Sequence, residues 1–178
     1  MRDTWDYSKM SCLIAEDNPH MRAILRSVLS GFGIRSVFEA SDGAEALELV
    51  LDRRPDIILC DWVMSPFGGD EFLRTLRADP DMIINTTPAL VVTAHSMRAT
   101  ILEALEIGIH GFVAKPISPS ILFKHIRDVL QRQELMGRSK GLSGSDNASI
   151  AAKNESDLSG SIVSHTIPGQ NGSDLAMI

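Results

Sequence analysis

The chain has 178 residues, enough for one ordinary domain and an appendage. Its formal net charge of −6 offers no electrostatic footprint for nucleic acid or for an anionic membrane surface. No stretch approaches the roughly 18 consecutive apolar residues of a membrane span, and the first residues lack the apolar segment of a secretory signal. We therefore expect a cytoplasmic protein in which Cys12 and Cys60, both within apolar runs, are buried fillers.

The first pair of predicted elements is a strand followed by a helix. Residues 10–15 form a short apolar run, which indicates a buried strand. Asn18 and Pro19 then supply an N-cap and a proline at the first helical position. Apolar residues follow at helical spacing, and the glycines from Gly31 onward indicate where this helix ends.

A second and a third strand are predicted at residues 34–39 and 56–60. Between them, the stretch 42–45 resembles a capping box and predicts a helix that stops before Pro55. A loop rich in proline and glycine follows the third strand, and a helix begins after it.

The remaining elements repeat this alternation. Residues 89–93 and 111–114 are predicted to be the fourth and fifth strands, with a helix from about Ser96 to Gly108 between them. Ser118 and the proline after it open a last helix. Five strand–helix units in this order imply an α/β fold with a parallel sheet and helices on both faces.

The chain divides into three parts by composition. Residues 1–9 are an N-terminal extension, residues 10–136 form the folded domain, and residues 137–178 are rich in Ser and Gly. The last segment has no aromatic residue and no sustained apolar period, so we predict a disordered tail.

Polar residues follow four of the five predicted strands at their carboxyl ends. Glu16 and Asp17 follow the first strand, Asp61 the third and Lys115 the fifth, while Thr93 closes the fourth. Ligand chemistry in parallel sheets collects at this edge, and a carboxylate there is costly unless a cation or a reaction needs it. Three acids, a hydroxyl and a lysine indicate a site for a divalent metal and a phosphoryl group.

With Lys115 followed by Pro116, and Gly69 eight residues after Asp61, the chain resembles the receiver domain of two-component response regulators. The resemblance covers about residues 10–133, and the chain is similar to the single-domain chemotaxis type. It implies a flavodoxin-like, doubly wound (βα)5 sheet with strand order 2-1-3-4-5. It also implies a phosphorylation-controlled binding module of a phosphorelay, not a turnover enzyme.

The resemblance assigns a role to each residue of the constellation. Asp61 would accept the phosphoryl group, and Lys115 would pair with the phosphoryl oxygens. Mg²⁺ would be held by Glu16, Asp17, Asp61 and the backbone carbonyl of Val63. The longer side chain of Glu16, where relatives more often carry Asp, is expected to reach the ion through water.

The resemblance also implies a switch and partners. Thr93 would donate its hydroxyl to the phosphoryl group, and the ring of Phe112 would turn inward behind it. The Lys115–Pro116 peptide bond would be cis. A sensor histidine kinase or a histidine phosphotransfer protein would supply the phosphate, and the state of Asp61 would select a downstream protein. The chain is expected to be a monomer or a phosphorylation-dependent homodimer.

Two local features remain open at the level of sequence. Ser65 stands where many relatives have proline, with Pro66 one residue later, so the loop geometry after Asp61 is not fixed by the pattern. The apolar stripe Met97, Ile101 and Leu105 fits either the core or a partner-binding face, and we favour the core.

Three other functions fit the sequence less well. An aspartate-nucleophile phosphatase would carry a second Asp two residues after Asp61, where this chain has Val63. A receiver-like scaffold that works without phosphate would normally lack one of the five residues. A nucleotide-binding flavodoxin-like protein needs a glycine-rich loop after the first strand, and here that loop is acidic.

Overall fold

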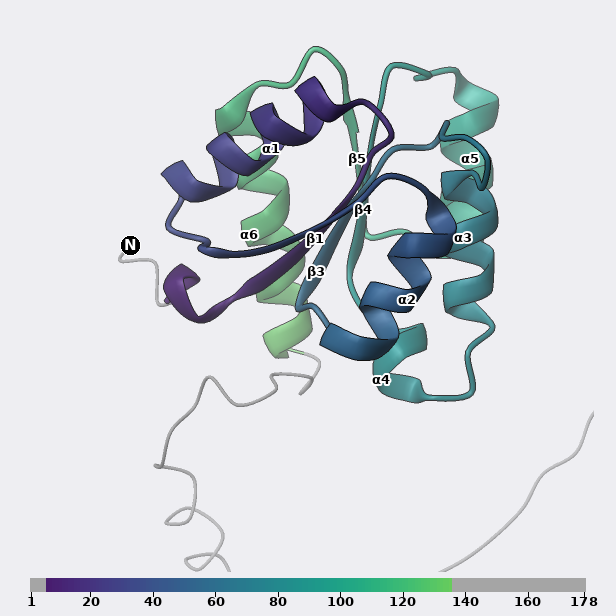
Figure 1. Cartoon of the computed structure of the whole chain (residues 1–178), viewed down its shortest axis with the longest axis horizontal. Helices are drawn as coiled ribbons and strands as arrows, with labels where there is room; N and C mark the ends of the chain where they lie inside the picture. The colour runs from purple at the N-terminus through teal and green to yellow at the C-terminus, as the bar shows by residue number, and fades with distance from the viewer. Residues whose placement is uncertain (1–5, 136–178) are drawn as a thin grey trace, which may run out of the picture. The chain divides into compact units, whose positions relative to one another are not determined.

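A five-stranded parallel sheet forms the centre of the computed structural model, which describes residues 6–135. The strands are β1 (Ser11–Ala15), β2 (Ser36–Ala40), β3 (Ile57–Cys60), β4 (Ala89–Thr93) and β5 (Gly111–Ala114). They pair in the order β2-β1-β3-β4-β5 (Figure 1), which confirms the predicted flavodoxin-like topology.

Helices cover both faces of the sheet. They are α1 (Pro19–Gly31), α2 (Gly43–Arg53), α3 (Gly69–Arg77), α4 (Met82–Asn85), α5 (Arg98–Ile107) and α6 (Pro119–Leu135). Figure 1 shows α1 and α6 on one side and α2, α3 and α5 on the other. The buried residues accordingly separate into two clusters, one on each face.

The central strands are buried on both faces. All four residues of β3 and all five of β4 are buried. Because successive side chains of a strand point to opposite faces, Ile58 and Cys60 join one cluster while Ile57 and Leu59 join the other. Burial on both faces explains why these strands appear in the sequence as continuous apolar runs.

The helix starts follow the predicted capping signals, with one difference. The Asn18 side chain accepts hydrogen bonds from the first-turn amides of α1, and Asp42 does the same for α2. In a complete capping box Glu45 would bond back to the amide of Asp42. Instead its carboxylate accepts from the amide and hydroxyl of Ser41, one residue earlier.

The structure corrects two predictions about the second half of the domain. The four-residue helix α4 was not predicted, because it is shorter than any helical period that the sequence reveals. The prediction that Met97 and Leu105 belong to the core is wrong, since their side chains are 67% and 54% exposed. The buried residues of helix α5 are instead the small Thr100 and Ala104, and Ile107 packs against the core, while Leu102 and Leu105 are exposed.

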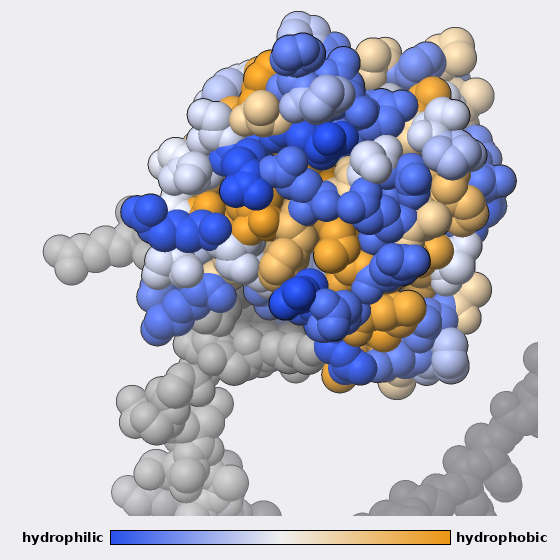
Figure 2. Space-filling model, in the orientation of Figure 1, coloured by the Kyte–Doolittle hydropathy of each residue, from blue (hydrophilic) through white to orange (hydrophobic). Residues whose placement is uncertain are grey.

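The surface carries hydrophobic patches separated by hydrophilic side chains on the face shown in Figure 2. Within residues 6–135, no helix is long and apolar enough to cross a membrane. Both cysteines are buried and free, as predicted. Part of the N-terminal extension forms a short 3-10 helix at Tyr7–Lys9, and Tyr7 packs against Phe123 of α6. The predicted tail at residues 137–178 lies outside the described residues.

Candidate functional site

The parallel strands bring the predicted polar residues to one edge of the sheet, at the top of Figure 1. Backbone hydrogen bonds fix the loops at this edge. The Asp61 amide donates to the Ala15 carbonyl at 2.8 Å, and the Lys115 amide donates to the Thr93 carbonyl at 2.9 Å. The pairing of β3 with β1 and of β5 with β4 therefore fixes the positions at which the loops of Asp61 and Lys115 begin.

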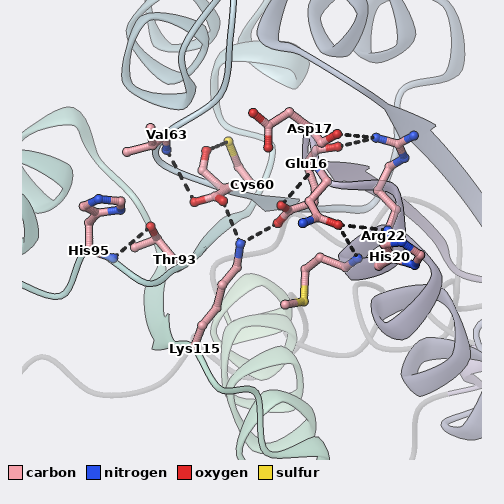
Figure 3. A network of polar contacts seen from close by, with 12 residues as sticks. Glu16, Asp17, His20, Arg22, Cys60, Val63, Thr93, His95 and Lys115 are labelled. Atoms are coloured by element: carbon pink, nitrogen blue, oxygen red, sulfur yellow. Dashed lines mark hydrogen bonds and ion pairs between the residues drawn. The ribbon is translucent and has the colours of Figure 1, made fainter.

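Lys115 lies at the centre of the site (Figure 3). Its Nζ donates to Oδ2 of Asp61 at 2.6 Å and to Oε2 of Glu16 at 2.7 Å. The Glu16 side chain is 2% exposed and that of Lys115 is 13% exposed, so both ion pairs are largely shielded from water. The Lys115–Pro116 bond is cis, as expected, and so is Ser65–Pro66 in the loop after Asp61.

Burial and the ion pairs set the protonation of this cluster. Burial raises the pKa of Glu16 above its usual value, against the hydrogen bond and the charge of Lys115, which lower it. Burial by itself would lower the pKa of Lys115, but its hydrogen bonds to Asp61 and Glu16 outweigh this and hold the pKa above the usual value. Lys115 is therefore a charged ammonium at neutral pH.

Three carboxylates gather beside this ammonium. One oxygen each from Glu16, Asp17 and Asp61 lies within 4.8 Å of the others. Carboxylate oxygens are the ligands that Mg²⁺ prefers, and it often uses one or two of them together with water. The chemistry and spacing of these groups fit such an ion. Val63 is 50% exposed and its amide approaches Oδ1 of Asp61 at 3.4 Å, while the role of its carbonyl stays a prediction.

Thr93 and Phe112 lie on one side of the sheet. Phe112 pairs in register with Val91, two residues before Thr93, so both side chains point to the face covered by α2, α3 and α5. Thr93 is fully buried, and its hydroxyl oxygen accepts the His95 amide at 3.2 Å. The Phe112 ring is half-buried against the core on this face.

Gly69 is required by the way α3 approaches the site. A Cβ at this position would lie 1.9 Å from the Asp61 carbonyl oxygen and 3.0 Å from the Cys60 sulfur. The Gly69 amide donates to the Trp62 carbonyl at 3.1 Å, which anchors the start of α3 to the residue after Asp61. The sequence located this glycine, and the structure gives the steric reason for it.

Two further residues hold the acidic loop and were missed by the sequence reasoning. The Asn18 amide approaches Oε1 of Glu16 at 3.4 Å, besides the role of Asn18 as the cap of α1. Arg22 donates from Nη1 to the carbonyl oxygens of Glu16 at 2.6 Å and of Asp17 at 3.3 Å. Its spacing offered a signal, because a residue four positions after the N-cap returns to the same helix face.

Comparisons with known proteins agree with this geometry. Residues 12–127 match the family model described as a response regulator receiver domain. The chemotaxis protein CheY of Pseudomonas aeruginosa is 34% identical over 123 residues, which span 69% of this chain and 98% of that protein. A protein-glutamate methylesterase/protein-glutamine glutaminase of Myxococcus xanthus is 38% identical over 62% of this chain and 31% of its own length. The solved structure of Vibrio cholerae CheY4 has a TM-score of 0.61 at 29% identity and covers 67% of this chain and 98% of its own.

Proposed function

Because this chain belongs to the response regulator receiver family, a family of two-component signalling, we propose that it accepts a phosphoryl group on Asp61 in a Mg²⁺-dependent reaction. The donor is a sensor histidine kinase or a histidine phosphotransfer protein. The observation that supports this most directly is the Lys115 ammonium bonded to both Asp61 and Glu16 beside the cluster of three carboxylates. An arrangement rich in oxygen ligands with one fixed cation suits phosphoryl transfer, which depends on positioning and charge neutralisation.

In the proposed step, a carboxylate oxygen of Asp61 attacks the phosphorus of the donor. The new O–P bond forms as the bond from phosphorus to the donor's imidazole nitrogen breaks, and that nitrogen keeps the electron pair. Lys115 already contacts Asp61 and lies close enough to neutralise charge on the phosphoryl oxygens. Glu16, Asp17, Asp61 and the Val63 carbonyl would hold Mg²⁺, which when bound neutralises charge and orients the phosphoryl oxygens.

Thr93 and Phe112 form the proposed switch. The Thr93 hydroxyl moves toward the new phosphoryl oxygens, and the half-buried Phe112 ring follows into the space behind it. Such a two-state element needs a bias of only a few kcal/mol to change its population substantially. Phe112 has no hydroxyl, so its contribution is one of packing.

The proposed output is a change in protein partners on the face formed by α5, β5 and α6. Exposed apolar side chains are available at α5, namely Leu102 and Leu105 in the helix and Met97 at its N-cap. The protein acts in the cytoplasm, as a monomer or as a homodimer that depends on phosphorylation.

We further propose that the chain is a signalling module and not a turnover phosphatase. An aspartate-nucleophile phosphatase uses a second acid two residues after the nucleophile, and here that position holds the apolar and exposed Val63. Incubation with para-nitrophenyl phosphate distinguishes the two classes. Sustained release of nitrophenol with Mg²⁺ would favour the phosphatase, and the absence of turnover is expected.

Phosphate-affinity electrophoresis after incubation with acetyl phosphate and Mg²⁺ tests the proposed acceptor. The parent protein should give a retarded band, Asp61→Asn should not, and EDTA should abolish the retarded band of the parent. Asp52→Asn is the matched control, because it removes an exposed carboxylate near the end of α2 and should behave like the parent. A retarded band of normal intensity from Asp61→Asn would exclude Asp61 as the acceptor.

A further inference from the structure

Arg22, in the first turns of α1, reaches back to the loop that carries the two leading acids. Its Nη1 donates to the carbonyl oxygens of Glu16 at 2.6 Å and of Asp17 at 3.3 Å (Figure 3). These two bonds are made to backbone oxygens and not to the carboxylates of Glu16 and Asp17. The Arg22 side chain is 19% exposed, and its bond to the Glu16 carbonyl is partly buried, while the longer bond to the Asp17 carbonyl lies at the surface.

The guanidinium is itself held in position from β2. Its Nε lies 3.4 Å from Oε2 of Glu39, and the other oxygen of Glu39 is bonded by Arg26, one turn further along α1. Arg22 therefore links three elements, namely the edge strand β2, the helix α1 and the acidic loop after β1. A planar guanidinium suits this role, because its donors point in fixed directions.

We propose that Arg22 is a positioning residue for the metal ligands Glu16 and Asp17. The direction of each carboxylate depends on the orientation of the peptide planes that follow these two residues, and Arg22 bonds the oxygen of both planes. Groups that orient metal ligands in this way commonly change metal affinity by about 10- to 100-fold when they are removed. The inference rests on the proposed function, since it assumes that the acidic loop binds a divalent cation.

Because Arg22 is positively charged, the direction in which its removal changes the Mg²⁺ affinity tests the proposal. A positive guanidinium near a cation site opposes cation binding by Coulomb repulsion. If charge were the only influence of Arg22, its removal would strengthen Mg²⁺ binding. If Arg22 positions the loop, its removal weakens binding despite the lost repulsion.

The test is a Mg²⁺ titration followed by Trp62 fluorescence in a Trp5→Phe background, with calorimetric titration as a readout independent of Trp62. Arg22→Ala should bind Mg²⁺ about tenfold more weakly than the parent. Arg22→Lys keeps the charge and one donor group, so its affinity should fall between the two. Arg74→Ala is the matched control, because it also removes an ion-paired guanidinium, but one that is bonded to Glu103 of α5 and not to Glu39 or the acidic loop, and its affinity should equal that of the parent.

Each outcome bears on a different claim. Equal or tighter Mg²⁺ binding by Arg22→Ala, with the parent binding normally, overturns the role of Arg22 and leaves the proposed function intact. A parent protein that binds no Mg²⁺ overturns the proposed function and this inference with it. Urea unfolding in EDTA verifies that each variant is folded. Should Arg22→Ala not fold, Arg22→Lys decides the matter, because an affinity equal to that of the parent overturns the proposal.

Discussion

Replacement of Gly69 by alanine is expected to destabilise the domain and to impair phosphorylation of Asp61. The added methyl group would lie 1.9 Å from the Asp61 carbonyl oxygen, whereas ordinary contact with a Cβ begins at 3.4 Å. The overlap is therefore about 1.5 Å. The obstructing atom belongs to the backbone and cannot rotate away, so either α3 or the peptide after Asp61 has to move.

The size of the effect follows from this geometry. Overpacking of a well-packed site costs about 1–3 kcal/mol, and an overlap with backbone on this scale belongs at the upper end, at about 3 kcal/mol. Gly31 provides a matched control, because a Cβ there meets nothing within 4 Å and its backbone is helical. Gly31→Ala should stabilise the protein by about 0.5 kcal/mol, mainly by restricting the unfolded chain.

Urea unfolding followed by circular dichroism measures both variants. With a denaturant slope of about 2 kcal/mol per molar urea, Gly69→Ala should lower the unfolding midpoint by about 1.5 M, and Gly31→Ala should raise it slightly. Acetyl phosphate labelling of the folded Gly69→Ala protein should also fall, because the clash displaces Asp61, the proposed acceptor of the phosphoryl group. A midpoint for Gly69→Ala within about 0.3 M of the parent, with normal labelling, would refute the steric reasoning.

Two further predictions concern the acidic loop. In a Trp5→Phe protein, Mg²⁺ should change the fluorescence of Trp62, and Asp17→Ala should remove this change because it deletes a proposed ligand; an undiminished response would count against Asp17. The pKa of Glu16 is higher in the folded protein than its usual value of 4.5, so the folded state binds the carboxyl proton more tightly than the unfolded state. In EDTA, the contribution of Glu16 to the free energy of unfolding should therefore fall as the pH rises from 4.5 through the pKa of the folded state. Glu16→Gln should therefore gain stability relative to the parent across this window in urea unfolding, and a difference independent of pH would contradict the assignment.

The strands and their order were predictable because their signal is local and strong. Strands β4 and β5 have the predicted limits, since each is a short apolar run, with Pro88 directly before β4 and Pro116 soon after β5. Strand β2 begins at Ser36, two residues later than expected from the run that starts at Ile34. As an edge strand it is only partly buried, so Ile34 joins the core from the preceding loop. The apolar run from Ile34 therefore shows which residues are buried, and it does not show where the hydrogen bonds between β2 and β1 begin.

Helix α5 shows where a sequence pattern cannot distinguish the buried face from the exposed one. Apolar residues occupy more than one side of this helix, and the spacing of Met97, Ile101 and Leu105 suggested a core stripe. In the structure the buried positions of this helix are held by Thr100 and Ala104, whose side chains are small. Which face of the helix is buried depends on the space between the helix and its neighbours, and the spacing of apolar residues along the sequence does not record that space.

The candidate site was predictable in its members but not in its contacts. The motif order placed all the polar residues at one edge, because parallel strands end there together. The bond between the Glu16 carboxylate and Lys115 was not predicted, and the expected contact of Glu16 with a metal ion through water stays a prediction. The bonds from Arg22 to the backbone could not be predicted either, because every residue has a carbonyl oxygen and the residue type does not show which one accepts.

The charges at this edge suggest why phosphorylation would change the fold around it. Three carboxylates and one ammonium give a formal charge of −2, which a divalent cation balances. A phosphoryl group carries about −2 where the acceptor carboxylate carried −1, so about one negative charge is left in excess. The Thr93 hydroxyl, held at this edge by the His95 amide, is the donor expected to respond. Thr93 and Phe112 share the sheet face beneath α5. A movement of Thr93 would therefore change the packing of the Phe112 ring, and with it the position of α5, where Met97 and Leu105 are exposed.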